Sequence, residues 1–322
     1  MHSILELQDI IEKAITKVQY PSHPARLYEP ISYIMSLGGK RIRPVLLLLS
    51  SELFNDDVTI AIEGALAIET FHNFTLIHDD IMDNAPIRRG KDTVHVKWGV
   101  NNAILSGDAM MVEANRHLTR LDTPVLKDVL TCFNDTASGV CEGQQLDMEF
   151  EQRTDVSIEE YISMIRLKTA VLVGGCMKIG AIIGGAGKAD ADLLYDFGVN
   201  FGLAFQLQDD ILDVYGDPLK FGKQVGGDII SNKQTYLLLK LKELVNTEDL
   251  QTLENLSATA DYQKKVAAVT ALYNRYNIRE LATAEMERRA DIAFTSLDKV
   301  SISDDRKSEL NLLARSLINR EH

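Results

Sequence analysis

The sequence has little cysteine, little proline and no long apolar run. Its three cysteines show no CxxC spacing, which excludes a disulfide framework and a zinc site of that type. Seven prolines in 322 residues leave long stretches without a helix breaker, which favours long helices over many short strands. No stretch approaches ~20 uninterrupted apolar residues, so no membrane span is predicted. The N-terminal stretch, 1–21, does not resemble a signal peptide, and we expect a cytoplasmic protein.

Basic residues are outnumbered by acidic ones: 34 lysines and arginines stand against 47 aspartates and glutamates, which gives a formal net charge of −13. A chain this acidic lacks the basic surface that nonspecific nucleic-acid binding requires, so no nucleic-acid partner is expected. The same balance does not exclude an anionic substrate, since bound metal ions can reverse the local sign of the charge.

Apolar residues recur at a spacing close to 3.6 along most of the chain, which predicts an all-α fold. One such stripe consists of Ile4, Leu7, Ile11 and Ile15. The run 45–49 could be a short buried strand, but Pro44 before it favours the start of a helix. Ser157 and Glu160 have the spacing of a capping box. No linker or break in composition divides the chain, so we expect a single domain over 1–322.

Two aspartate-rich motifs each end an apolar helical stretch and precede a loop with glycine and basic residues. They are Asp79-Asp80-x-x-Asp83 and Asp209-Asp210-x-x-Asp213. On a helix the first and last aspartates of each motif share a face, where their charges repel each other. A cation relieves this repulsion, and oxygen ligands without histidine or cysteine suit magnesium. One such motif is weak evidence for a metal site, whereas two are strong evidence.

Basic residues gather close to the first motif. The segment 38–44, GGKRIRP, contains three of them, and Arg88, Arg89 and Lys91 follow Asp83. Guanidinium groups bind phosphate in a bidentate manner, and glycines let backbone N–H groups approach an anion. A basic run is more often a solvated surface, but in an acidic chain this concentration beside the aspartates indicates phosphate binding. We expect one phosphate group bound through metal and another bound directly by cations.

These motifs together resemble those of trans-type isoprenyl diphosphate synthases, the polyprenyl synthetase family. The resemblance runs from about Leu37 to Thr235. It rests on GGKRIRP, HNFTLIHDDIMDNAPIRRG, GQQLD, LKTA and FQLQDDILDVYGD, in this order. It implies an isoprenoid-synthase-like helical bundle around a deep central cavity, with the two aspartate motifs facing each other across its mouth. It also implies a homodimer.

The resemblance further implies an enzyme that condenses isopentenyl diphosphate head-to-tail with allylic diphosphates, using three magnesium ions. The implied metal ligands are Asp79, Asp83 and Asp209, supported by Asp80, Asp210 and Asp213. Isopentenyl diphosphate would be held by Gly39, Lys40, Arg43, His72 and Arg89. The allylic diphosphate would be held by Arg88, Lys168, Gln206, Lys223 and Lys233, with Thr169 beside the reacting carbons. Gln144 and Asp147 would line the cavity. His78 and His95 are assigned no role.

The length of the product depends on residues that precede Asp79 on its helix. Phe74 lies about 7.5 Å along the axis from Asp79. A helical wheel places Thr75 nearer the metal face, so periodicity alone does not select the cavity floor. The resemblance selects Phe74, where a large ring predicts short products. We therefore expect geranylgeranyl diphosphate, with farnesyl diphosphate as the alternative, because Phe71 one turn deeper could shorten the pocket. Core packing is the other interpretation of both rings.

Two other functions compete with chain elongation. A class I terpene cyclase shares the helical fold and a first aspartate motif, but its second metal motif normally contains Asn, Ser and Glu. A non-catalytic subunit of a heteromeric synthase tends to lose the aspartates, and this chain retains both sets. Both alternatives are therefore disfavoured.

Overall fold

The computed structural model describes residues 1–216 and 226–318. The chain folds into two compact units. Unit 1 comprises Met1–Asn134, Cys176–Leu194 and Ser301–Leu310, and unit 2 comprises Asp135–Gly175, Tyr195–Val300 and Asn311–His322. Each unit is thus assembled from several segments of the chain, and each contains one of the two aspartate motifs.

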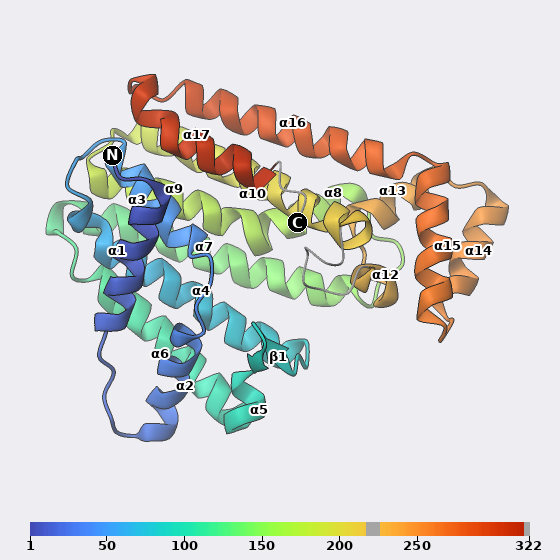
Figure 1. The fold of residues 1–322 in the computed structure, drawn as a ribbon, viewed down its shortest axis with the longest axis horizontal. Helices are drawn as coiled ribbons and strands as arrows, with labels where there is room; N and C mark the ends of the chain where they lie inside the picture. Colours follow the sequence, from blue (N-terminus) through green and yellow to red (C-terminus); the bar gives the residue numbers. More distant parts are fainter. Residues whose placement is uncertain (217–225, 319–322) are drawn as a thin grey trace. The chain divides into compact units, whose positions relative to one another are not determined.

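Unit 1 is built almost entirely from helices (Figure 1). In chain order its elements are α1 (Ile4–Lys17), α2 (Ala25–Ser36), α3 (Ile42–Glu52), the 3-10 helix η1 (Val58–Ala61), α4 (Ile62–Met82), β1 (Ile87–Arg88), β2 (Lys91–Asp92), α5 (Val94–Trp98) and α6 (Val100–Leu118). The strands β1 and β2 form a two-residue antiparallel pair and are the only strands among the described residues. The predicted all-α class is therefore confirmed.

Unit 2 is also helical. Its own elements are α8 (Ile158–Ile165), the π-helix η2 (Arg166–Ala170), α12 (Gly227–Ile230), α13 (Tyr236–Leu244), α14 (Thr247–Ser257), α15 (Tyr262–Arg275) and α16 (Ile278–Asp298). Four further helices contribute residues to both units: α7 (Thr123–Phe150), α9 (Val171–Gly184), α10 (Lys188–Tyr215) and α17 (Asp304–Ile318).

Two local predictions are confirmed. The run 45–49 lies inside α3, and all five of its residues are buried. Ser157 caps α8 by accepting from the Glu160 N–H at 3.1 Å, while the Glu160 carboxylate accepts from the Ser157 N–H at 2.9 Å. These reciprocal bonds satisfy two donors that the start of a helix otherwise leaves unpaired.

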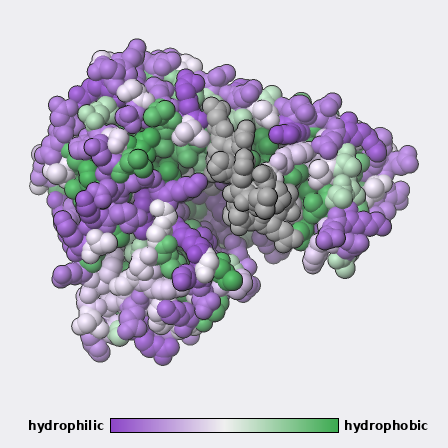
Figure 2. Space-filling model, in the orientation of Figure 1, coloured by the Kyte–Doolittle hydropathy of each residue, from purple (hydrophilic) through white to green (hydrophobic). Residues whose placement is uncertain are grey.

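Leucine, alanine, isoleucine and valine make up most of the buried core, and on the face drawn in Figure 2 hydrophobic residues show in separate groups among hydrophilic ones. One stretch, Ile158–Gly184, is long and apolar enough to cross a membrane by length and composition. Of its most apolar window, 72% is buried within the structure, and the core helix of a globular protein passes the same test.

Close packing in unit 1 depends on glycine in α9. A Cβ atom at Gly180 would overlap the Leu47 carbonyl oxygen and lie 3.0 Å from Ser50 Cβ. Backbone atoms of α3 cannot move aside as a flexible side chain could. We predict that Gly180→Ala lowers the free energy of unfolding by about 1–3 kcal/mol through overpacking. Thermal and chemical denaturation would measure this loss.

Gly187 provides a matched control, because a Cβ there would meet nothing within 4 Å. Gly187→Ala should change the unfolding free energy much less than Gly180→Ala. Equal effects of the two substitutions would contradict the packing argument.

Candidate active site

The first aspartate motif ends α4, and its three carboxylates differ in their surroundings. Asp79 is half-buried and Asp83 is exposed, whereas Asp80 is 1% exposed. Asp80 accepts from Arg88, with Nε 3.0 and 2.9 Å from its two carboxylate oxygens and Nη2 2.8 Å from Oδ1. The middle aspartate therefore ties the β1 strand to the end of α4, and the outer two occupy the more accessible face.

The second motif, near the end of α10, repeats this arrangement. Asp209 and Asp213 are half-buried, and Asp210 is 4% exposed. The hydroxyl of Tyr161 donates to Asp210 Oδ2, and Gln206 Nε2 donates to Asp210 Oδ1 at 3.2 Å. Burial, assisted by the negative charge of Asp228, raises the pKa of Asp210 to about 7. In each motif the middle carboxylate is thus the most buried, and the outer two are more accessible; of these, Asp213 Oδ2 accepts from the Asp228 N–H at 3.0 Å.

The accessible carboxylates fit a magnesium ion by their donor chemistry. Asp79 lies in the last turn of α4 and Asp83 is the C-cap residue of that helix, while Asp209 and Asp213 are four residues apart within α10. These groups supply only oxygen donors, which magnesium prefers, and magnesium usually keeps waters and binds substrate phosphates beside one or two carboxylates. Asp80 is already held by Arg88.

A positively charged cluster forms in unit 1 from residues of three segments. Arg43 Nη1 donates to His72 Nε2 at 3.3 Å, while Arg43 Nε is buried and has no hydrogen-bond partner in the described part of the chain. Arg89 Nη1 donates to the carbonyl oxygen of Gly38. Gly39 has φ +144°, and a Cβ there would lie 3.0 Å from Arg89 Cζ. Only glycine combines this backbone with so close a guanidinium.

Electrostatics within this cluster favour binding an anion. Burial, and then the charges of Arg43 and Arg89, hold the pKa of His72 well below its usual value, so its imidazole is neutral. Burial also lowers the pKa of Arg89, and the neighbouring Arg41 adds to this effect. A buried Nε donor without an acceptor beside crowded positive charge is the arrangement that a diphosphate would complete.

Arg41 is different from the other basic residues of its segment. Its side chain is 4% exposed, its Nη1 donates to Glu69 at 2.5 Å, and its Nε donates to Glu12 at 2.7 Å. Its Nη2 donates to the Met35 carbonyl oxygen at 2.8 Å. Arg41 therefore joins α1, α2 and α4 and is structural. The sequence contained no signal for this, because the carboxylate partners Glu12 and Glu69 lie 29 and 28 positions away along the chain.

In unit 2 the π-helix η2 carries Lys168 and Thr169. Lys168 Nζ donates to Asp147, which brings together two predicted residues. A Cβ at Gly143 would overlap Lys168 N, so the glycine allows α7 to approach the π-helix. A π-helical turn inside a helix is often found at functional sites. The half-buried lysine thus has a carboxylate partner within the protein itself.

A chain of hydrogen bonds leads from Thr169 to the second motif. Thr169 Oγ1 donates to Gln206 Oε1 at 3.4 Å, and Gln206 Nε2 donates to Asp210. Tyr161, which completes the chain, was missed in the sequence. A tyrosine on an apolar helix face carries no recognisable signal until its partner, Asp210, is known.

The remaining predicted residues are placed as follows. Gln144 is buried at 9% exposure. Lys40 and Lys233 are exposed, and the Lys40 carbonyl oxygen accepts from Gln8. The positive charge of Lys233 lowers the pKa of Asp210 against the larger effect of burial. Lys223 lies outside the described residues.

The predicted chain-length residues lie on α4. Phe71 is fully buried, and its ring centroid lies 5.5 Å from that of Phe74 and 5.3 Å from that of Phe133. Phe74 is half-buried, and Thr75 Oγ1 donates to the His72 carbonyl oxygen at 2.8 Å. Core packing thus accounts for Phe71, whereas Phe74 keeps part of its ring accessible.

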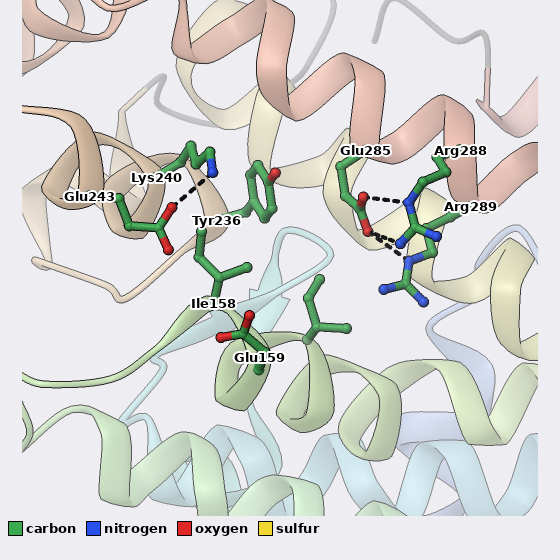
Figure 3. A pocket seen from close by; sticks show the side chains of 9 residues that line it. Ile158, Glu159, Tyr236, Lys240, Glu243, Glu285, Arg288 and Arg289 are labelled. Atoms are coloured by element: carbon green, nitrogen blue, oxygen red, sulfur yellow. Dashed lines mark hydrogen bonds and ion pairs between the residues drawn. The ribbon is translucent and has the colours of Figure 1, made fainter.

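A separate pocket of about 500 Å³ in unit 2 contains none of the predicted residues (Figure 3). It is lined by Ile158, Glu159, Ile162, Tyr236, Lys240, Glu243, Glu285, Arg288 and Arg289. Its cations are paired with glutamates: Lys240 with Glu243 at 2.8 Å, and Arg288 and Arg289 with Glu285 at 2.7 and 2.8 Å. We therefore do not take it as the active site.

Comparison with known proteins settles the family. A family model described as polyprenyl synthetase matches residues 24–275, which includes both aspartate motifs. This chain belongs to the polyprenyl synthetase family. The resemblance stated from the motifs is thereby confirmed, together with the isoprenoid-synthase type of helical fold.

Individual polyprenyl synthetases are similar over nearly the whole chain. A short chain isoprenyl diphosphate synthase of Methanothermobacter thermautotrophicus is 41% identical, covering 93% of this chain and 92% of its own. A geranylgeranyl diphosphate synthase of Sulfolobus acidocaldarius is 39% identical over 92% of this chain and 91% of its own. The crystal structure of a geranylgeranyl pyrophosphate synthase is 41% identical, covers 100% of both chains and has a TM-score of 0.94.

The lowered pKa of His72 gives a prediction about pH. The unfolded chain takes up a proton at this residue near pH 6.5, while the folded chain does so only at lower pH. The stabilising contribution of neutral His72 is thus present above pH 6.5 and is lost as the pH falls below it. Arg43→Gln should raise the pKa of His72 by removing a neighbouring charge.

Nuclear magnetic resonance of the imidazole nitrogens and carbons would follow this titration, with His72→Gln used to assign the signal. Lys97→Gln removes a positive charge elsewhere in unit 1 and should leave the His72 pKa unchanged. A wild-type His72 that titrates near pH 6.5 would refute the prediction.

Proposed function

We propose that this protein is a magnesium-dependent, chain-elongating prenyltransferase that joins isopentenyl diphosphate head-to-tail to an allylic diphosphate. The observation that carries the proposal is the repeated aspartate motif. Both copies place a buried middle carboxylate against hydrogen-bond donors and leave the outer pair more accessible. Membership of the polyprenyl synthetase family supports the same activity, and the match spans residues of both units, in keeping with one domain over 1–322.

Two groups of residues would divide the substrates between them. Gly39, Lys40, Arg43, His72 and Arg89 would hold isopentenyl diphosphate without metal. The buried, unpartnered Nε of Arg43 supports this assignment. Arg88, Lys168, Gln206, Lys223 and Lys233 would hold the allylic diphosphate, with Thr169 beside its reacting carbon.

Asp79, Asp83, Asp209 and Asp213 would hold magnesium, with Asp80 and Asp210 as support. Three ions is the number that the resemblance implies. The metal supplies positive charge that stabilises the departing diphosphate.

The reaction begins when the allylic carbon–oxygen bond breaks and the diphosphate leaves with the electron pair. The cationic side chains stabilise negative charge on this leaving group as it develops. Lys168, now paired with Asp147, lies in the segment that would meet it. The double bond of isopentenyl diphosphate then forms the new carbon–carbon bond, and the resulting cation loses a proton from the adjacent carbon to the released diphosphate, which restores a double bond. The oxygens of Thr169 and Gln206 would stabilise the cation, and the enclosing side chains would exclude water.

Geranylgeranyl diphosphate is the product we propose, with farnesyl diphosphate second. The names of the relatives from Sulfolobus acidocaldarius and Methanosarcina mazei support the twenty-carbon product. Packing of Phe71 against Phe133 supports a core role for Phe71 and so weakens the case for the shorter product. A cytoplasmic location is also part of the proposal, and a homodimer is part of it through the family resemblance alone.

The aspartates give a direct test of the proposed activity. Asp79→Ala and Asp209→Ala should each lower turnover of labelled isopentenyl diphosphate by at least about 10²-fold, because charge stabilisation of the leaving group is lost. Chelation of divalent ions should abolish the activity of the wild type, and added magnesium should restore it. Asp128→Ala changes an exposed aspartate of α7 and should leave turnover unchanged. Full activity in either motif variant would contradict the proposed role of the aspartates in turnover.

The proposed cavity floor has its own test. Phe74→Ala should lengthen the product by at least one five-carbon unit, because the ring that stops the growing chain is removed. Chromatography of products made from labelled isopentenyl diphosphate with geranyl and farnesyl starters would measure this. An unchanged product length would remove Phe74 from the floor.

A further inference from the structure

Three aromatic rings form a ladder along one face of α4. Phe74 is the middle ring, 5.5 Å from Phe71 and 4.8 Å from His78 between centroids. The Phe74 and His78 rings meet at 64°, an edge-to-face arrangement. These residues are three and four positions apart, so their side chains are neighbours on the helix surface. The ring proposed to stop the growing chain is therefore bounded on both sides.

The His78 ring is itself held by α6. Its Nε2 lies 3.2 Å from the Ile104 carbonyl oxygen, the geometry of a donated hydrogen bond. A Cβ at Gly107 would overlap His78 Nε2 and lie 2.7 Å from its Cδ2. Because Gly107 has no side chain, the imidazole can lie directly against the α6 backbone. Asp108 is nearby, but its carboxylate is 3.9 Å from Nε2 and 59% exposed, so packing rather than charge holds the ring.

This contact restricts the movement of Phe74. Side chains on a helix have few allowed rotamers, and a large ring changes rotamer only if space opens beside it. On one side Phe71 is fully buried and backed by Phe133. On the other side His78 is wedged between Phe74 and the backbone of α6. Loss of the His78 ring would open space on that side alone.

We propose that His78 is a specificity-determining residue, which positions Phe74 and thereby sets the length at which chain growth stops. The inference rests on the proposed function and deepens it. His78 acts through Phe74 and not on the reacting atoms, so it is a positioning residue. Gly107 is part of the same arrangement, because only a residue without a side chain leaves room for the His78 imidazole against α6.

Product length distinguishes this role from general destabilisation. His78→Ala and Gly107→Ala should each shift part of the product to longer chains, in the direction of Phe74→Ala but less far. The first variant removes the imidazole ring. The second leaves no room for the ring against α6, so the imidazole must leave the space beside Phe74. His78→Asn, which also lacks a ring, serves where the alanine variant folds poorly. Product length can be read from whatever product forms, independently of total yield.

Asp108→Asn is the matched control, since it removes the nearby charge and leaves the packing intact. It should leave product length unchanged. The decisive comparison uses the Phe74→Ala background, in which adding His78→Ala should lengthen the product no further.

Unchanged length in both single variants, or equal lengthening by His78→Ala with and without Phe74, would overturn the inference. A wild-type protein that consumes no isopentenyl diphosphate would instead overturn the proposed function, so the two failures are distinguishable.

Discussion

Mutual repulsion between carboxylates one helical turn apart is the constraint that both aspartate motifs share. Two aspartates four residues apart are costly unless a cation lies between or beside them. In each motif the middle aspartate points elsewhere and is anchored, by Arg88 in one case and by Tyr161 and Gln206 in the other. The anchors hold each helix end in place, so that the outer pair of carboxylates stays on the more accessible face.

Arginine serves two opposite purposes within one short segment. Arg41 has its charge balanced by Glu69 and Glu12 and holds three helices together. Arg43, two residues later, is left with a neutral histidine and a buried Nε that has no partner in the described chain. An unpaired buried donor costs free energy, and bound diphosphate would remove that cost. The segment therefore uses Arg41 for stability, and the unpartnered Nε of Arg43 supports the proposed substrate role of that residue.

The sequence predicted what depends on local spacing and missed what depends on distant partners. The all-α class followed from the 3.6 periodicity, and the shared face of Asp79 and Asp83 followed from helix geometry. Family resemblance supplied Arg43, His72 and Lys168. Neither route could find Tyr161, because its role exists only through Asp210, which lies 49 positions away.

Glycine at position 107 carried no signal for the same reason. Its importance comes from His78, which lies on another helix, and the missing Cβ matters only at that contact. Composition alone did not distinguish Arg41 from the basic residues beside it, and its pairing with Glu69 does. Long-range pairing, not propensity, separates these residues from their neighbours in sequence.

Helix α4 carries both the start of the first aspartate motif and the aromatic rings at which, in the proposed scheme, chain growth would stop. Its last turn presents Asp79, and its preceding turns present Phe74 and Phe71. A helix rises a fixed 1.5 Å per residue, so in the proposed site the distance from the metal to the cavity floor would be set by the number of residues between Asp79 and Phe74. The orientation of the Phe74 ring can still vary, and Phe71 and His78 contact this ring from its two sides. In the proposed scheme α4 sets this distance, and His78, held against Gly107 of α6, would fix the Phe74 ring at which chain growth stops.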